Sequence, residues 1–423
     1  MYPGSATLSS SYVLAPSVSN IGDAIYVAAP STPATIAGTN IIYQEPQGGR
    51  AAAVDELAST QQWLTEVIIG GQAFNLTVDT GSSDLWVYGK GCTLAPGVDY
   101  ASVIPHAEYN CVSGQTSNCQ NQGSFNITYA LGFGASGGLV YDTVNVSNAI
   151  VPDMGVEVAN VSGGYAAFPA DGILGLAFQS LNTANPQQPT FMEKLMPRLP
   201  EPLFTVDFIP QEGGNIAQIE FGHINTKKAN GNMNTAPVNN ASGFWQVDNI
   251  SFTIGDPGTG LLIPINSSMI FEALVVDTGG STQISVDPRI LAYYYSYVLG
   301  SVLVNGSGIS YNFPCNATLP DLTLNIGNGT AIYRSSLLNT YTVDSATNMC
   351  SGPLGSHTNE TGQVGNMGAA FFAYHFVVFN QGVPEVSYAP WLPYPGTPGT
   401  AGTKERRNLF ERTTIPESER DWI

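Results

Sequence analysis

Two copies of the tripeptide Asp-Thr-Gly have the clearest capacity for chemistry in this chain. The first is Asp79-Thr80-Gly81 and the second is Asp277-Thr278-Gly279, and each follows an apolar run that predicts a strand. An Asp at the end of a buried strand costs free energy unless it is paired or hydrogen-bonded. Two such copies, 198 positions apart, indicate that each half of the chain carries one loop and that the loops meet at a shared interface.

Two facing carboxyl groups can act together as an acid and a base. Close carboxylates do not both ionise readily, so one keeps a proton while the other stays charged. The charged group can take a proton from water while its neighbour donates one to a carbonyl oxygen, which hydrolyses a peptide bond without a metal or a covalent intermediate. We therefore interpret Asp79 and Asp277 as a catalytic pair.

The neighbours of each Asp have supporting roles. Gly81 and Gly279 let the backbone turn tightly and approach a carboxylate, and the hydroxyls of Thr80 and Thr278 can lock one loop against the other. A single Asp-Thr-Gly is also consistent with an ordinary turn. Two matched copies, each after an apolar strand, favour the functional interpretation.

The elements around these loops are mostly predicted strands. A composition with 46 Gly, 28 Pro and only 11% charged residues suits short strands joined by tight turns, so we expect an all-β fold. Helical patterns are short and cover residues 190–199 and 288–297. Strands are predicted over residues 63–69, 74–78, 125–129, 138–146, 203–208, 244–254, 319–326 and 371–379.

The length of the chain predicts two lobes. A chain of 423 residues is too long for one ordinary core, and lobes of about 150 to 200 residues are expected. We assign residues 51–230 to an N-terminal lobe with the first loop and residues 231–395 to a C-terminal lobe with the second. Residues 1–50 are interpreted as a weakly structured leader, and residues 396–423 as a disordered tail.

The charge and the remaining side chains exclude several function classes. With 32 acidic against 13 basic residues, the chain repels phosphate backbones and anionic lipid heads, so we expect no nucleic acid and no membrane partner. The four His residues show no ligand spacing, and no Ser or Cys lies in a nucleophile elbow, so we expect no metal and no cofactor. A metal or nucleophile hydrolase is thereby disfavoured.

Eleven Asn-x-Ser/Thr sequons indicate the secretory pathway, although a chain rich in Asn, Ser and Thr also makes sequons by chance. Residues 1–49 contain no Lys, Arg or His and so no basic-then-apolar signal; either the true start is missing or export follows another route. Five cysteines permit at most two internal bridges, and three pairings remain open among Cys92, Cys111 and Cys119. The sequons lie at Asn75, Asn126, Asn145, Asn160, Asn240, Asn249, Asn266, Asn305, Asn316, Asn328 and Asn359.

From about residue 63 to residue 392 the chain resembles the pepsin-like aspartic peptidases. Residues 78–87 (VDTGSSDLWV) are similar to that family's first active-site motif, residues 127–129 and 138–144 to its flap hairpin, and residues 171–177 (DGILGLA) to the segment beneath the first loop. Further similarity lies at residues 244–247, 319–322 and 377–390. The resemblance implies a bilobal fold of two similar, barrel-like lobes, with the substrate cleft between them.

The same resemblance implies an activity and further site residues. It implies a secreted or vacuolar, monomeric endopeptidase that cleaves peptides in acid between apolar residues. Tyr129 is then expected to close over the peptide, with Trp86 steadying its hydroxyl, although packing alone also explains both rings. Ser82 joins the support of the first carboxylate, and Cys315 and Cys350 stand where a disulfide is usual in the family.

Two departures from the family pattern keep a rival function open. Gly280 stands where the family keeps a hydroxyl residue, so a hydrogen bond to the second carboxylate is expected to be lost unless Ser281 compensates. Beneath this loop, residues 366–369 (NMGA) replace a more apolar pair followed by Gly and Asp, which is expected to weaken the support of Asp277. The rival is a catalytically impaired, peptidase-like binding or inhibitor protein.

Overall fold

The fold was analysed in a computed structural model of the whole chain. The described residues are 50–55, 63–97, 104–111, 119–129, 133–208, 216–229, 231–255, 263–264, 272–280, 284–306, 308–333, 341–344, 346–352, 354–356, 364–372 and 374–390. The predictions for the leader before residue 50, for the tail from residue 396, and for Ser281 lie outside these residues.

The first half of the chain is almost entirely strands. Its two helical segments near residue 195 are α1 (Phe191–Leu195) and the 3-10 turn η5 (Met196–Arg198), and further 3-10 turns are η3 (Gly164–Ala167), η4 (Gln179–Leu181) and η6 (Thr226–Lys228). The strands are β1 (Arg50–Asp55), β2 (Trp63–Ile69), β3 (Gln72–Asp79), β4 (Leu85–Leu94), β5 (Ser124–Thr128), β6 (Gly134–Val146), β7 (Ala149–Ser162), β8 (Gly172–Gly175), β9 (Leu203–Asp207) and β10 (Ile216–Phe221).

The second half repeats this strand-rich character, with shorter strands. Its helical segments are η7 (Asn240–Ser242), α2 (Pro288–Tyr295) and α3 (Ala369–Phe372). The strands are β11 (Asn234–Pro237), β12 (Gln246–Ile254), β13 (Ile263–Pro264), β14 (Glu272–Val276), β15 (Ile284–Ser285), β16 (Val302–Asn305), β17 (Ile309–Pro314), β18 (Leu322–Ile326), β19 (Gly329–Tyr333), β20 (Tyr341–Asp344), β21 (Met349–Ser351), β22 (Leu354–Gly355), β23 (Gly365–Met367), β24 (His375–Asn380) and β25 (Glu385–Pro390).

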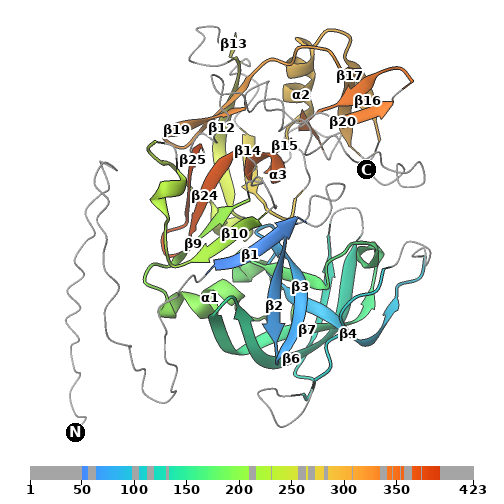
Figure 1. Cartoon of the computed structure of the whole chain (residues 1–423), viewed down its shortest axis with the longest axis vertical. Coiled ribbons are helices and arrows are strands. Elements are labelled where there is room, and N and C mark those ends of the chain that lie inside the picture. The colour runs from blue at the N-terminus through green and yellow to red at the C-terminus, as the bar shows by residue number, and fades with distance from the viewer. Residues whose placement is uncertain are drawn as a thin grey trace, which may run out of the picture.

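The strands form three sheets, which confirms the predicted all-β, bilobal fold. The largest has 13 strands in the order β11-β25-β24-β9-β10-β1-β2-β3-β8-β4-β7-β6-β5, so strands of the first and second halves of the chain meet where β24 pairs with β9. The second has eight strands, built around β12, β14 and β23, and the third is β16-β17-β21-β20. In Figure 1 the blue and green strands β2 to β7 form the lower body, and β12 to β20 lie in the upper one.

Each Asp-Thr-Gly loop follows a buried strand that has a parallel partner. The hairpin of β2 and β3 turns at Gly70 and Gly71, whose φ angles of +56° and +80° favour glycine. Strand β3 then pairs in parallel with β8, in the register Asp79 with Gly175. In the second half, β14 pairs in parallel with β23, in the register Val275 with Asn366. In both halves, the Asp-Thr-Gly loop therefore follows a strand that is paired in parallel with a second strand.

Most predicted elements are confirmed, with one correction. The strand predicted over residues 371–379 is wrong at its start, because Phe371 and Phe372 belong to helix α3 and only residues 375–380 form β24. The run is apolar throughout, and a buried run without period cannot distinguish a helix from a strand. The predicted helix at residues 190–199 is confirmed as α1 and η5, with Thr190 and Glu193 forming a capping box.

Trp245 joins the two halves of the core. Its fully buried ring packs on Phe178, Phe204 and Phe379, with ring centroids 4.6, 6.0 and 5.0 Å away. Its indole Nε1 donates a hydrogen bond to the Leu176 carbonyl oxygen at 2.9 Å. The segment beneath the first loop is thus tied to the second half of the molecule.

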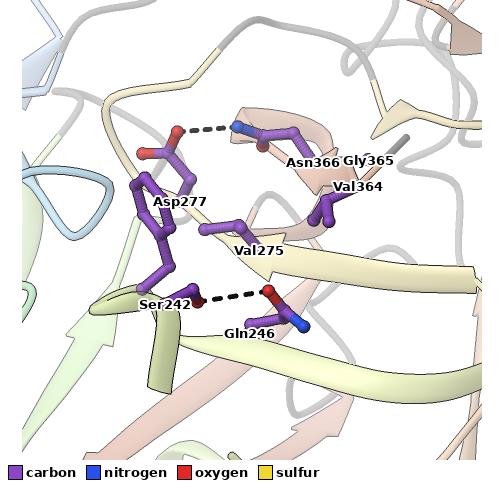
Figure 2. A pocket seen from close by; sticks show the side chains of 8 residues that line it. Ser242, Gln246, Val275, Asp277, Val364, Gly365 and Asn366 are labelled. Carbon is purple, nitrogen blue, oxygen red and sulfur yellow. Dashed lines mark hydrogen bonds between the residues drawn. The ribbon is translucent and has the colours of Figure 1, made fainter. Parts of the chain in front are cut away.

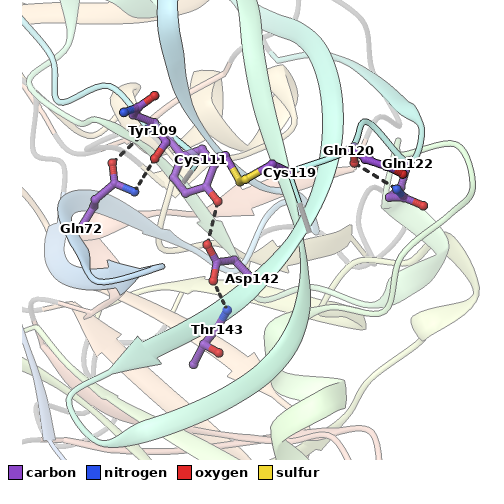
Figure 3. The surroundings of a disulfide bond; sticks show 9 residues. Gln72, Tyr109, Cys111, Cys119, Gln120, Gln122, Asp142 and Thr143 are labelled. Carbon is purple, nitrogen blue, oxygen red and sulfur yellow. Dashed lines mark hydrogen bonds between the residues drawn. A yellow bond between two sulfur atoms is a disulfide. The ribbon is translucent and has the colours of Figure 1, made fainter. Parts of the chain in front are cut away.

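Two disulfides and one free thiol account for the five cysteines. Cys315 pairs with Cys350, as the resemblance implied, and Cys111 pairs with Cys119, which leaves Cys92 free. Figure 3 shows the surroundings of the first-half disulfide, where the Tyr109 hydroxyl donates to Asp142 Oδ2 at 2.7 Å.

Candidate active site

The two Asp-Thr-Gly loops face one another, with each glycine against the opposite carboxyl group. A Cβ atom on Gly81 would lie 2.5 Å from Asp277 Oδ1, and one on Gly279 would collide with the carboxyl of Asp79. The two carboxyl groups are close enough for Asp79 to raise the pKa of Asp277. Only glycine at both positions leaves room for this approach of the two carboxyl groups.

The two threonines lock the loops together by reciprocal hydrogen bonds. Thr80 N donates to Thr278 Oγ1 and Thr278 N donates to Thr80 Oγ1, both at 3.0 Å. The hydroxyls donate in turn to backbone carbonyls of the opposite strand, Thr80 Oγ1 to Val276 O at 2.8 Å and Thr278 Oγ1 to Val78 O at 2.7 Å. Both threonines are buried, so these bonds are shielded from water and fix the distance between the loops.

The environment of Asp277 favours its protonated form. Burial, followed by the charge of Asp79, raises the pKa of Asp277 well above its usual range. The short-range interaction with the Asp79 carboxyl group acts in the same direction, while the donors Asn366 and Gly279 act against it. The pair therefore retains one proton, which we assign to Asp277.

Each carboxylate accepts hydrogen bonds from residues of its own half of the chain. Gly81 N donates to Asp79 Oδ1 at 2.7 Å, and the Ser82 hydroxyl donates to Asp79 Oδ2. Gly279 N donates to Asp277 Oδ1 at 2.9 Å, and Asn366 Nδ2 donates to Asp277 Oδ2 at 2.7 Å. The expectation that the second carboxylate loses a hydrogen bond was wrong. Asn366 supplies one from β23, 89 positions further along the chain.

Tyr129 and Trp86 are joined beside the first carboxylate. Tyr129 directly follows β5 in the hairpin with β6, and its backbone N donates to Phe133 O at 2.6 Å. Trp86 is fully buried, and its Nε1 donates to the Tyr129 hydroxyl at 2.8 Å. Burial, with the nearby charge of Asp79, raises the pKa of Tyr129 well above its usual value, so the phenol stays neutral.

A pocket of about 300 Å³ opens beside Asp277 (Figure 2). Its apolar lining comes from Phe244, Val275 and Val364. Its polar lining includes Asn366 and Gln246, whose Oε1 accepts a hydrogen bond from the Ser242 hydroxyl at 3.2 Å. The pocket is placed to receive a side chain next to the carboxyl pair.

A second buried carboxyl pair beneath the first loop was not predicted from the sequence. Asp84 and Glu157 are 0% and 1% exposed, and each carboxyl group contributes to the pKa of the other. Asp84 Oδ1 accepts bonds from Thr183 N at 3.0 Å and Thr183 Oγ1 at 2.6 Å, and Glu157 Oε1 accepts one from Asn182 Nδ2 at 2.8 Å. Burial, then the charge of Asp84, raises the pKa of Glu157 well above its usual range, so Glu157 holds the proton between them.

The histidines of the described ranges lie apart from each other and have separate contacts. His106 stacks on Tyr88 at 4.2 Å, and His375 is buried and stacks on Phe371 at 4.6 Å. Burial lowers the pKa of His375 to about 4. Across the part of the chain that the structure describes, no three His, Cys, Asp or Glu side chains gather as a metal site requires, and no helix is long and apolar enough to cross a membrane.

A strand-rich bilobal fold with two facing Asp-Thr-Gly loops defines the class of pepsin-like aspartic peptidases. Comparison with protein-family models gives a match to the eukaryotic aspartyl protease family over residues 62–391. The chain belongs to this family.

Individual relatives agree with this assignment. Penicillopepsin-3 of Penicillium janthinellum is 31% identical over 331 residues, which are 78% of this chain and 78% of that protein. Aspergillopepsin-1 of Aspergillus fumigatus is 31% identical over 354 residues, which are 82% of this chain and 84% of that protein. The crystal structure of an aspartic proteinase from Irpex lacteus superposes with a TM-score of 0.64 over 84% of this chain and 99% of that one, at 22% identity, and supports the fold.

Proposed function

We propose that the chain is an aspartic endopeptidase that hydrolyses peptide bonds in acid by means of a water activated between Asp79 and Asp277. The observation that carries the proposal is that the two loops face each other, each glycine against the opposite carboxyl group, and are held in place by the Thr80 and Thr278 lock. A pair held in this way, with one proton, has an acid and a base ready at the same time.

The proton positions assign the two roles. Asp277 carries the proton, so Asp79 is the base that takes a proton from the attacking water. The water oxygen bonds to the carbonyl carbon while Asp277 donates its proton to the carbonyl oxygen. In the second step the tetrahedral intermediate returns that proton to Asp277, the leaving nitrogen takes the proton held by Asp79, and the carbon–nitrogen bond breaks. The pair ends in its starting protonation state.

The surroundings of the pair support a peptide substrate with apolar side chains. The pocket beside Asp277 offers Phe244, Val275 and Val364 to an apolar side chain. Trp86 donates a hydrogen bond to the Tyr129 hydroxyl. Tyr129 lies where β5 turns toward β6, a position from which this hairpin can close over an extended peptide. We therefore propose Asp79 and Asp277 as catalytic residues, with Tyr129 contacting substrate and Thr80, Gly81, Ser82, Trp86, Thr278 and Gly279 as positioning residues.

We also propose that the protein works outside the cell or in an acidic vacuole, as a monomer. Of the nine sequon asparagines among the described residues, eight are exposed and only Asn145 is half-buried, so glycans could be attached without unfolding. The raised pKa values of Asp277 and Glu157 favour a folded, active form in acid. A net charge of −19 at pH 7 agrees with this environment.

The proposal is tested with the purified full chain and a quenched apolar peptide from pH 3 to pH 7, with and without pepstatin. We expect cleavage in acid that pepstatin blocks. Cleavage that pepstatin leaves untouched would point to another mechanism or a contaminant. If the chain binds pepstatin in calorimetry and cleaves nothing, the binding or inhibitor function becomes the better account.

A further inference from the structure

Asp79 Oδ2 and Asp277 Oδ2 receive their side-chain hydrogen bonds from different kinds of donor. In the first loop the donor to Asp79 Oδ2 is the hydroxyl of Ser82, three residues along the chain. The equivalent position in the second loop is Gly280, which has no side chain to offer. Asp277 Oδ2 accepts instead from Asn366 Nδ2 at 2.7 Å, the contact drawn in Figure 2.

Gly280 and Asn366 share one space. A Cβ atom built on Gly280 would lie 2.7 Å from Asn366 Nδ2, 2.8 Å from Asn366 Oδ1 and 2.8 Å from Asp277 Oδ2. These separations are shorter than van der Waals contact, so a side chain at position 280 and the Asn366 amide exclude one another in their present places. The absence of a side chain at position 280 is therefore what admits the amide to the carboxylate.

The fold holds the Asn366 amide in this place. Asn366 lies in β23, directly opposite Val275 in the parallel pairing with β14. Asp277 N donates to Met367 O at 3.2 Å, which continues that pairing to the carboxylate itself. The amide is thus carried by a strand that is tied to the Asp277 loop on both sides of the contact.

We propose that Asn366 is the positioning residue of Asp277, taking over through its amide nitrogen the task that Ser82 performs for Asp79. This inference rests on the proposed function and deepens it. An amide nitrogen only donates, whereas a hydroxyl can also accept. Asp277 Oδ2 therefore stays a hydrogen-bond acceptor in both charge states of the carboxyl group.

The test is a double-mutant cycle of Asn366→Ala and Gly280→Ser, with Asn110→Ala, at an exposed site, as the matched control. We expect Asn366→Ala to lower kcat on the order of ten- to a hundredfold with little change in KM, because a hydrogen bond to an ionisable group is lost. Gly280→Ser alone should also lower kcat, through collision with the amide. In the double variant the serine hydroxyl gains the vacated space, and kcat should recover to within about fivefold of the wild-type value.

The pH profile separates positioning from a merely structural effect. Asn366 favours the ionised form of Asp277, and Asp79 is the titratable group that faces Asp277 from the other loop. Removing the amide should therefore move the alkaline limb of kcat/KM to higher pH. The inference would be overturned if Asn366→Ala kept the wild-type kcat and the wild-type position of the alkaline limb of kcat/KM. It would also be overturned if the double variant had a kcat no higher than that of Asn366→Ala.

A second measurement does not depend on peptidase activity. Below pH 7 the wild-type Asp277 already holds its proton, because its pKa is raised to about 8. With the amide gone this pKa rises further, so between pH 7 and pH 9 Tm should keep falling in Asn366→Ala where it levels off in the wild type and in Asn110→Ala. Parallel Tm curves would count against the role of Asn366. An inactive wild-type chain would contradict the proposed function alone, because this comparison still tests Asn366.

Discussion

The first and second Asp-Thr-Gly loops have the same backbone plan and rest on different chemistry. In the first loop, Asp79 Oδ2 accepts a hydrogen bond from Ser82, and the loop lies above the buried acid pair of Asp84 and Glu157. The second takes the corresponding bond from Asn366 and has no such acid pair among the described residues around it. The support of the first loop therefore contains a proton that a rise in pH can remove, whereas the support of the second is an amide that does not titrate.

We expect the largest effect from a methyl group placed between the two loops. Gly81→Ala directs a Cβ at Asp277 and Gly279→Ala directs one at Asp79, so both variants should force the carboxyl groups apart. We expect each to lower kcat/KM by on the order of a thousandfold or more, because a displacement of this kind removes the aligned pair. Peptide cleavage at pH 4 measures this effect, with Gly306→Ala, whose added Cβ meets only the Gly308 carbonyl oxygen at 4.0 Å, as a control for the methyl group.

If only one of the two glycine variants lost activity, the loops would not be equivalent partners. Pepstatin binding and Tm, measured on the same samples, distinguish a displaced carboxyl pair from an unfolded chain.

The two halves also differ in the loop that their disulfide closes. Cys315 and Cys350 are 35 positions apart, and Cys111 and Cys119 only 8. The chain-entropy relation gives a stabilisation of about 4 kcal/mol for the longer loop and about 2.5 kcal/mol for the shorter one. Replacing each pair by serines should therefore lower the free energy of unfolding in urea more for the Cys315 pair. An equal or reversed order would show that strain or residual structure, and not loop length, decides.

The proton beneath the first loop gives a smaller, pH-dependent effect. The pKa of Glu157 is raised above its unfolded value, so the stability linked to its proton is complete below about pH 4.5 and is lost as pH rises. The charges that face Glu157 and Asp84 are each other and Asp79, with the neutral phenol of Tyr129 nearby. Glu157→Gln keeps a hydrogen-bond donor without a titrating proton, so it should flatten the fall of Tm between pH 5 and pH 8.

The exposed Glu201→Gln is the matched control for this variant. If Tm fell with pH as steeply in Glu157→Gln as in the control, the proton of Glu157 would not contribute to the pH dependence of stability. The first loop would then differ from the second only in the kind of donor that holds its carboxylate.

The sequence predicted the parts of the site that lie close together along the chain. The motif around Asp79, its repeat at Asp277, and the hairpin of β2 and β3 follow from local pattern and turn residues. Asn366 was misjudged, because its contact depends on the parallel register of β14 with β23, which no local pattern reveals. Glu157 was missed for a similar reason, since β7 is buried on both faces from Met154 to Glu157 and shows no alternation there.

The disulfide pairing of the first-half cysteines could be decided only from the three-dimensional structure. Cys92 lies in β4, while Cys111 and Cys119 flank residues outside the described ranges, and spacing alone could not choose among the three. The fold class could be predicted because composition and period act along the whole chain.

Whether Asp79 and Asp277 act as one catalytic unit is measured by kcat/KM at pH 4 for Asp79→Asn, Asp277→Asn and the double variant, with the exposed Asp153→Asn as control. We expect both single variants and the double variant to fall to the same residual level, on the order of ten-thousandfold or more below the wild type, while the control keeps its activity. A single variant that retains substantial cleavage, or a double variant whose loss is the product of two moderate losses, would contradict it.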